Sequence, residues 1–292
     1  MKTCVYYATY ECNDTCEFCG MWQRSEKGAE APVEVIREKL KELKRREVNK
    51  LVVTGGEPLL NDALPEILRI AKGFNFEIDL YTNGILYAER SAAIEKLTDK
   101  LFFSLDYPIL SEHDRSRGVD CFDLVVEGIE IARDKKENAV ISFTITRDSI
   151  RFLPEMVELS EKLKVPLHIN PVYDFFGTQG FDKRSIQSIK YYSKRKNVFS
   201  DLAMLAFVEN GGNKAILPRC RAGETTITLL PDGRITRPCY FNQDGKQGKE
   251  DICSSCMRSE YMLPSFSVGL DKYFWLNLYS EWVNKRKKEE VK

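Results

Sequence analysis

The chain has 292 residues, 43% of them apolar and 30% charged, and its 44 basic residues balance its 44 acidic ones. This composition is that of an ordinary globular protein and excludes a disordered or membrane-embedded chain. Because the net charge is zero, no overall basic field exists to hold nucleic acid, and we expect no nucleic-acid partner.

The beginning of the chain enters an apolar run directly, without a basic and apolar signal segment. No stretch reaches the roughly 18 apolar residues of a membrane helix. We therefore expect a cytoplasmic protein with no membrane partner. Nine cysteines in such a chain argue against a disulfide framework and favour metal or redox chemistry in a reducing compartment.

Short β-branched runs alternate with amphipathic helical stretches over most of the chain. The runs cover 5–9, 50–54, 76–81, 100–105, 139–146 and 166–172. The helical stretches cover 33–48, 64–72, 89–96, 122–134 and 153–164, and further helices are predicted over 183–211. Serial β-then-α units predict an α/β fold with a parallel sheet, whose functional residues gather at the carboxyl ends of the strands. We place this domain at 1–212.

The loop after the first run carries Cys12, Cys16 and Cys19 in a C-x3-C-x2-C arrangement. Thiolates are soft ligands that select iron–sulfur, zinc or Cu(I). A closed site needs four ligands and this loop supplies three, which leaves one metal position for another group. The alternative is a zinc knuckle completed by a distant fourth ligand. Cys4 and Cys121 stand alone and are expected to be small core residues.

The next three predicted strands each end in a short polar motif. These are Thr54-Gly55-Gly56-Glu57-Pro58, then Thr82-Asn83-Gly84, then Ser104-Leu105-Asp106. Each motif alone fits a structural turn, since glycine, proline, asparagine and aspartate all favour turns.

Taken in order, the cysteine loop with Phe18 before its last cysteine, the G-G-E-P element, T-N-G and S-x-D resemble the motifs of the radical S-adenosylmethionine (SAM) enzymes. The resemblance implies a partial (β/α)6 barrel that is open at the side where substrate enters. It implies an oxygen-sensitive [4Fe–4S] cluster held by Cys12, Cys16 and Cys19, whose open iron takes the amino and carboxylate groups of SAM.

The resemblance also implies contacts to SAM. Glu57 would accept a hydrogen bond from the SAM ammonium, with Gly55 and Gly56 as close backbone neighbours. Ser104 would contact the ribose or the carboxylate, whereas Asp106 fits a cofactor contact and a turn cap equally well. The predicted cofactor-binding residues are Phe18, Gly55, Gly56, Glu57, Ser104, Asp106, Thr144, Thr146 and Asn170.

The last three of these come from the fifth and sixth predicted strands. Thr144 and Thr146 alternate onto one face, beside the place where relatives hold the methionyl carboxylate and the ribose. Asn170 lies on the strand that would follow the adenine edge. Relatives commonly carry a small residue after the S-x-D aspartate, where this chain has Tyr107, so we expect a reshaped substrate side.

A second cysteine group follows residue 213. A predicted hairpin, 225–230 and 234–238 around Pro231-Asp232-Gly233, places Cys220 and Cys239 near its open ends, and Cys253 and Cys256 form a C-x2-C pair. Four thiols make a complete ligand set for a metal.

The spacing of this second group resembles the twitch or SPASM auxiliary domains of radical SAM enzymes, with one extra residue before Cys239 and without the longer SPASM cysteine series. We interpret 213–292 as such a domain with one auxiliary [4Fe–4S] cluster, and structural zinc is the alternative. Behind it Tyr273, Trp275, Tyr279 and Trp282 have helical spacing, and we expect them to pack on the barrel.

The resemblance implies an oxidoreductase or maturase type of enzyme. It would cleave SAM reductively to a 5′-deoxyadenosyl radical that abstracts hydrogen from a substrate C–H bond, with the auxiliary cluster relaying an electron. A non-catalytic iron–sulfur scaffold is the other alternative. The expected partners are a low-potential electron donor such as ferredoxin or flavodoxin and a small-molecule, protein or peptide substrate.

Because the first predicted strand begins almost at once, we expect no leader-binding module, which favours a small molecule or a protein as the substrate. Tyr107, Tyr173, Phe175 and Phe176 would lie near the open face of the barrel.

Overall fold

The structure is a computed structural model that describes residues 2–23, 28, 30–171, 183–212, 220–236, 238–243, 253, 256 and 258–291. No helix in these ranges is both long and apolar enough to cross a membrane. The predicted pocket residues Tyr173, Phe175 and Phe176 lie outside the described part of the chain.

A single large sheet organises the described chain, with strands in the order β7-β6-β5-β4-β3-β2-β1-β8-β9. Neighbouring strands from β7 through β8 are parallel, and β9 is antiparallel to β8. A small second sheet pairs β10 with β11. The strands are β1 Lys2–Tyr7, β2 Val48–Thr54, β3 Glu77–Thr82, β4 Lys100–Ser104, β5 Ala139–Ile145, β6 Leu167–Pro171, β7 Val198–Phe199, β8 Thr226–Leu229, β9 Ile235–Thr236, β10 Pro238–Cys239 and β11 Asn242–Gln243.

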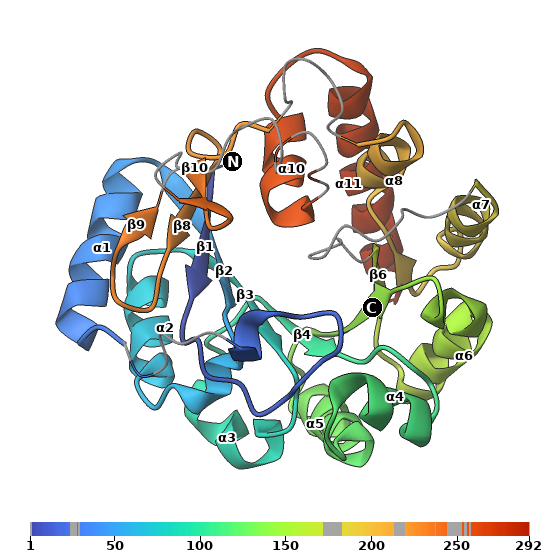
Figure 1. The fold of residues 1–292 in the computed structure, drawn as a ribbon, viewed down its shortest axis with the longest axis horizontal. Coiled ribbons are helices and arrows are strands. Elements are labelled where there is room, and N and C mark those ends of the chain that lie inside the picture. The colour runs from blue at the N-terminus through green and yellow to red at the C-terminus, as the bar shows by residue number, and fades with distance from the viewer. Residues whose placement is uncertain are drawn as a thin grey trace.

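Helices α1, α2, α3, α5 and α6 lie outside the curved sheet along its convex side, whereas α8, α10 and α11 pack on one another and α10 contacts the concave face of β1 and β8 (Figure 1). The helices are α1 Val33–Arg45, α2 Leu64–Gly73, α3 Tyr87–Ile94, α4 Leu110–Arg117, α5 Phe122–Asp134, α6 Leu153–Leu163, α7 Lys183–Tyr192, α8 Leu202–Glu209, α10 Ser259–Phe266 and α11 Lys272–Val291, with the 3-10 turns η1 Met21–Gln23, η2 Pro58–Leu60 and η3 Ser149–Phe152. The edge strands β7 and β9 do not pair with each other in the described residues, so the barrel is open.

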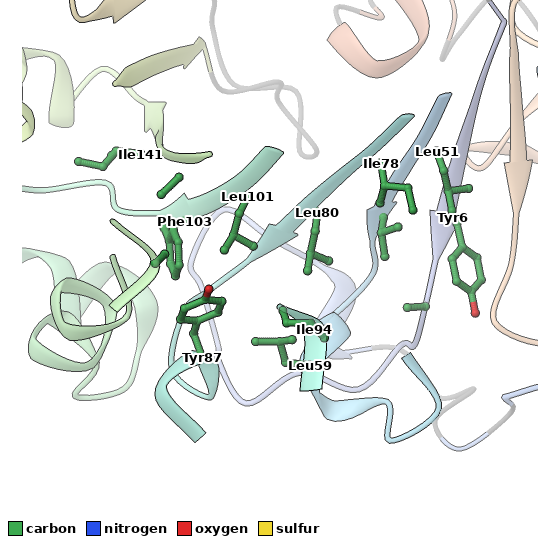
Figure 2. Packing of buried hydrophobic residues seen from close by; sticks show 14 of the residues in the cluster. Tyr6, Leu51, Leu59, Ile78, Leu80, Tyr87, Ile94, Leu101, Phe103 and Ile141 are labelled. Carbon is green, nitrogen blue, oxygen red and sulfur yellow. The ribbon is translucent and has the colours of Figure 1, made fainter. Parts of the chain in front are cut away.

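The main core lies between the convex face of the sheet and the helices. Figure 2 shows Leu51, Ile78, Leu80, Leu101 and Phe103 projecting from successive strands toward this layer. Because side chains alternate along a strand, the residues between them face the barrel interior. The interior row includes Ser104, Ser142 and Asn170, and the Asn170 Nδ2 donates to Ser142 Oγ at 2.8 Å.

The predicted fold class is confirmed, and all six predicted strands form in sequence order as parallel neighbours. The predicted hairpin also forms as β8 and β9, but β8 pairs with β1 and extends the main sheet. The proposed boundary after residue 212 therefore does not coincide with an edge of the sheet. Helix α4 was not among the predicted elements.

The expectation that the C-terminal aromatic residues pack on the protein is wrong for most of them. Tyr273 is buried, with its ring 5.3 Å from that of Phe266, but Trp275, Tyr279 and Trp282 are 60%, 54% and 51% exposed. Helix α11 packs on α8 and α10 through the face that carries Tyr273, so the other aromatic side chains project outward.

Candidate functional site

The cysteine loop lies over the carboxyl ends of the strands. Figure 1 shows the dark-blue chain after β1 crossing in front of the sheet toward α4. The turn after β2 fixes the start of this loop, since Gly56 N donates to Thr9 O at 2.9 Å and Glu57 N donates to Glu11 O at 2.7 Å. A Cβ atom on Gly56 would lie 1.9 Å from Glu11 O. Only glycine permits this close approach of two backbones.

Glu57 is buried under the loop, and its carboxylate joins two strand ends. Oε1 accepts from Leu59 N at 2.9 Å and from Thr82 Oγ1 at 2.8 Å, and Oε2 accepts from Asn83 N at 2.7 Å. Burial raises the pKa of Glu57 to about 7, although these donors oppose that shift. The G-G-E-P and T-N-G motifs are therefore one connected unit.

The three loop cysteines are free thiols in a half-buried to buried setting. Burial raises the pKa of Cys12 to about 12 and raises the pKa values of Cys16 and Cys19, and the Cys19 sulfur adds to the shift at both of the others. Desolvated thiols of this kind stay protonated unless a cation stabilises the thiolates, which is what metal binding does.

Helix α4 holds the other side of the loop. Arg117 is 5% exposed and forms an ion pair with Asp106, while its Nη1 lies 3.4 Å from Asp14 Oδ2 and 3.5 Å from Cys16 Sγ. The Arg117 carbonyl accepts from Thr15 N at 2.9 Å. No motif in the sequence predicts a role for Arg117. The glycine that follows it, Gly118 at φ 72°, is the one signal that a helix ends here.

Asp106 is a structural junction as well as a predicted cofactor contact. Besides Arg117, it accepts from Thr144 N at 2.8 Å through Oδ1, and its own N–H donates to His113 Nδ1 at 3.2 Å. One carboxylate thus connects the end of β4 to the end of β5 and to α4. The side-chain bonds of Asp106 go to Thr144 and Arg117, whereas a turn cap would bond the backbone that follows it, and the predicted cofactor contact stays a prediction.

The remaining predicted residues line the same edge of the sheet. The Phe18 ring centroid lies 5.6 Å from the Arg117 guanidinium carbon. Thr146 N and Oγ1 are held by Ser149 Oγ at 2.8 and 3.2 Å. Ser104 pairs with Ser142 in the ladder, so Ser104 and Asn170 lie close to one another through Ser142.

The second cysteine group brings Cys220 near Cys239, Cys253 and Cys256. Burial raises the pKa of Cys220 to about 12, and the sulfurs of Cys256, Cys239 and Cys253 add to that shift. All four are free thiols.

A buried aromatic cluster contacts cysteines of both groups. The Tyr7 and Tyr240 rings stack at 4.4 Å, and Cys19, Cys220 and Cys239 all pack against the cluster that contains these rings. Residues from both cysteine groups therefore contact one continuous patch of buried side chains.

Among the residues that the structure describes, no three histidine, cysteine or carboxylate side chains converge as ligands of a single metal ion do. Cluster thiolates bind different iron atoms, so they lie farther apart than ligands that share one ion. Both cysteine groups consist of neighbouring free thiols, and the loop group is clamped on two sides by backbone contacts. This donor chemistry fits an iron–sulfur cluster at the loop, and at the second group it fits an iron–sulfur cluster or zinc.

An open parallel β/α barrel with a three-thiol loop at the carboxyl edge of its strands defines a class of metal-cofactor enzymes. The family model described as "Radical SAM superfamily" matches residues 6–159, and the chain belongs to this family. The family implies a [4Fe–4S] cluster and SAM as cofactors.

Relatives of known name cover most of the chain. It is 31% identical over 273 residues to a "Probable GTP 3',8-cyclase" of Saccharolobus solfataricus, covering 87% of this chain and 86% of the relative. It is 26% identical to a protein of the same name from Archaeoglobus fulgidus, covering 83% and 88% of the two chains.

Solved structures share the fold at low sequence identity. Streptococcus suis SuiB bound to S-adenosylmethionine matches at a TM-score of 0.70 and 16% identity, over 89% of this chain and 66% of SuiB. The enzyme anSMEcpe with bound AdoMet matches at 0.65 and 15% identity, over 99% and 97% of the two chains.

Proposed function

We propose that this chain cleaves SAM reductively at a [4Fe–4S] cluster held by Cys12, Cys16 and Cys19, and uses the resulting radical to abstract hydrogen from a substrate C–H bond. When bound, the cluster supplies the electron that splits the sulfonium. The observation that carries the proposal is the docking of Gly56 and Glu57 onto the cysteine loop, because it sets an acceptor for an ammonium group close enough to Cys12 for the Glu57 charge to act on that thiol.

Glu57 has the capacity to bind the SAM ammonium. A carboxylate offers about four lone-pair positions, and Leu59, Thr82 and Asn83 use three of them. One acceptor position remains, and a cation there would also compensate the buried negative charge. Ser104, Thr144, Thr146 and Asn170 are proposed to hold the ribose, the carboxylate and the adenine, with Phe18 beside the cluster.

The test is anaerobic reconstitution with iron and sulfide, followed by measurement of 5′-deoxyadenosine formed from SAM under a low-potential reductant. A Cys12→Ala/Cys16→Ala/Cys19→Ala variant is expected to lose about four irons and all deoxyadenosine formation. Fully loaded wild-type protein that forms no deoxyadenosine would favour the non-catalytic scaffold.

We also propose an auxiliary [4Fe–4S] cluster at Cys220, Cys239, Cys253 and Cys256. Four protein thiolates leave no iron open, so its proposed contribution is electron transfer and not substrate anchoring. The shared aromatic cluster around Tyr7 and Tyr240 supports a connection between the two cysteine groups. Iron counting separates the alternatives, since two clusters hold about eight irons per chain and one cluster with zinc holds about four.

The relay is tested with Cys253→Ala in protein whose first cluster is fully loaded, using Cys121→Ala as a control because Cys121 is a buried thiol outside both groups. Product formation should fall at least tenfold in the first variant and stay unchanged in the second. Unchanged product formation in Cys253→Ala would show that the relay assignment is wrong.

A small molecule is the substrate class that we propose first. The relatives named as GTP 3',8-cyclases match both halves of this chain, so GTP is the first compound to assay, followed by other nucleotides and by peptides. The interior cations at the amino ends of the strands do not provide a triphosphate site, since Lys50 pairs with Asp79 at 2.6 Å and Lys100 with Glu77 at 3.6 Å. Substrate-dependent deoxyadenosine formation is the measurement.

A further inference from the structure

Arg117 lies where a cluster ligand, two carboxylates and a helix end meet. Its guanidinium contacts Asp106, Asp14 and the sulfur of Cys16, and the side chain is 5% exposed. The helix end is fixed to the loop by main-chain bonds, from Thr15 N to Arg117 O at 2.9 Å and from Glu17 N to Ser116 O at 3.2 Å. The position of the guanidinium relative to Cys16 is therefore set by backbone as well as side-chain contacts.

Cluster binding at Cys16 would place the negative charge of its thiolate next to the Asp14 carboxylate. As a thiol, Cys16 donates to Asp14 Oδ2 at 3.6 Å. A cluster-bound Cys16 is a thiolate, which has no proton to donate and would face the Asp14 carboxylate as a like charge. The guanidinium contacts both groups, and it stays charged in any protein environment. It therefore offsets a repulsion that cluster binding creates.

We infer that Arg117 is a positioning residue that donates a hydrogen bond to the Cys16 thiolate and thereby raises the reduction potential of the cluster. Reduction adds negative charge to the cluster, so a hydrogen bond and a positive charge at a ligand sulfur favour the reduced state. Asp14 and Asp106 act in the opposite sense, and Arg117 offsets them. This inference rests on the proposed function, because it requires a cluster at Cys12, Cys16 and Cys19.

The experiment is an anaerobic redox titration of the reconstituted full chain, followed by electron paramagnetic resonance without SAM. The first cluster is identified as the signal that is missing from the Cys12→Ala/Cys16→Ala/Cys19→Ala variant. Arg117→Met removes the charge and the donor. We expect the equilibrium constant for one-electron reduction of the first cluster to fall at least tenfold, which corresponds to a reduction potential about 59 mV more negative. Arg115→Met is the matched control, since Arg115 lies on the same helix with its side chain 67% exposed, and its potential should equal that of wild type.

A second variant predicts a shift of the opposite sign. Asp106→Asn keeps an acceptor for Thr144 N but removes the negative charge that lies beside the Arg117 guanidinium. The reduction potential of the first cluster should therefore rise. If the Arg117→Met variant does not bind the first cluster, the reduction potential measured in Asp106→Asn still tests the inference. An unchanged potential in loaded Arg117→Met, or no rise in Asp106→Asn, overturns the inference. Equal iron content in wild type and the triple alanine variant would instead overturn the proposed function.

Discussion

The hydroxyl of Thr82 donates to Oε1 of Glu57 at 2.8 Å, which joins the end of β3 to the turn that follows β2. The same carboxylate accepts a hydrogen bond from the backbone N–H of Asn83 through Oε2. The backbone of the same turn holds the cysteine loop, since Gly56 N donates to Thr9 O and Glu57 N donates to Glu11 O. The turn after β2 therefore connects three consecutive strand ends, the third through the Glu57 carboxylate and the first through its backbone.

Gly56→Ala should displace the cysteine loop. The added Cβ would meet Glu11 O at 1.9 Å, a contact with backbone that cannot rotate away. We expect the free energy of unfolding to fall by about 1–3 kcal/mol and iron incorporation at the loop to fall with it. Urea unfolding and iron analysis measure both effects. Gly73→Ala is the control, because nothing lies within 4 Å of its added Cβ and it should be neutral or stabilising.

Glu57→Gln should weaken both the strand-end junction and SAM binding. A glutamine amide nitrogen cannot accept from Leu59 N, Thr82 Oγ1 or Asn83 N, so at least one buried bond is lost. The expected cost is about 1–3 kcal/mol of unfolding free energy, together with at least a tenfold weaker SAM affinity in calorimetry. Glu89→Gln, whose side chain is 72% exposed, should change neither quantity. Wild-type SAM affinity in Glu57→Gln would remove Glu57 from the proposed ammonium site.

His113 should make the protein sensitive to acid. It is fully buried, and burial, with a smaller contribution from Arg117, lowers the pKa of His113 to about 2. The unfolded chain has an ordinary histidine pKa of about 6.5, so below that pH it binds a proton that the folded protein does not. The contribution of neutral His113 to the free energy of unfolding is complete above pH 6.5. It declines as the pH falls, by about 2 kcal/mol at pH 5.

His113→Asn tests this linkage, because an amide oxygen can still accept from Asp106 N but does not titrate. Urea unfolding at pH 5, 6, 7 and 8 should show a shallower loss of stability on acidification in the variant, beneath a constant packing cost. Parallel curves for the two proteins between pH 7 and 5 would contradict the prediction.

The sequence was sufficient for the sheet and for the motifs that the sheet brings to one edge, because both depend on local patterns. Strand positions follow from apolar runs, and α1 follows from Ile36, Leu40 and Leu43 on one face. Helix α4 lacks such a face, since its buried side chains are His113, Ser116 and Arg117. It is held by polar partners outside the helix, Asp106 just before it and Asp14 more than a hundred residues before Arg117. No periodicity indicates contacts of this kind, and Arg117 was missed for that reason.

Helix α11 offers a direct comparison between a buried and an exposed aromatic residue. Tyr273 is 6% exposed and packs against Phe266 and Phe207 at ring distances of 5.3 and 5.6 Å, whereas Trp275 is 60% exposed. Tyr273→Ala should therefore lower the unfolding free energy by about 3 kcal/mol, and Trp275→Ala should change it by no more than about 0.5 kcal/mol. Urea unfolding of the two variants in parallel is the measurement. Equal losses would mean that the aromatic stripe faces the protein after all, as its helical spacing alone suggests.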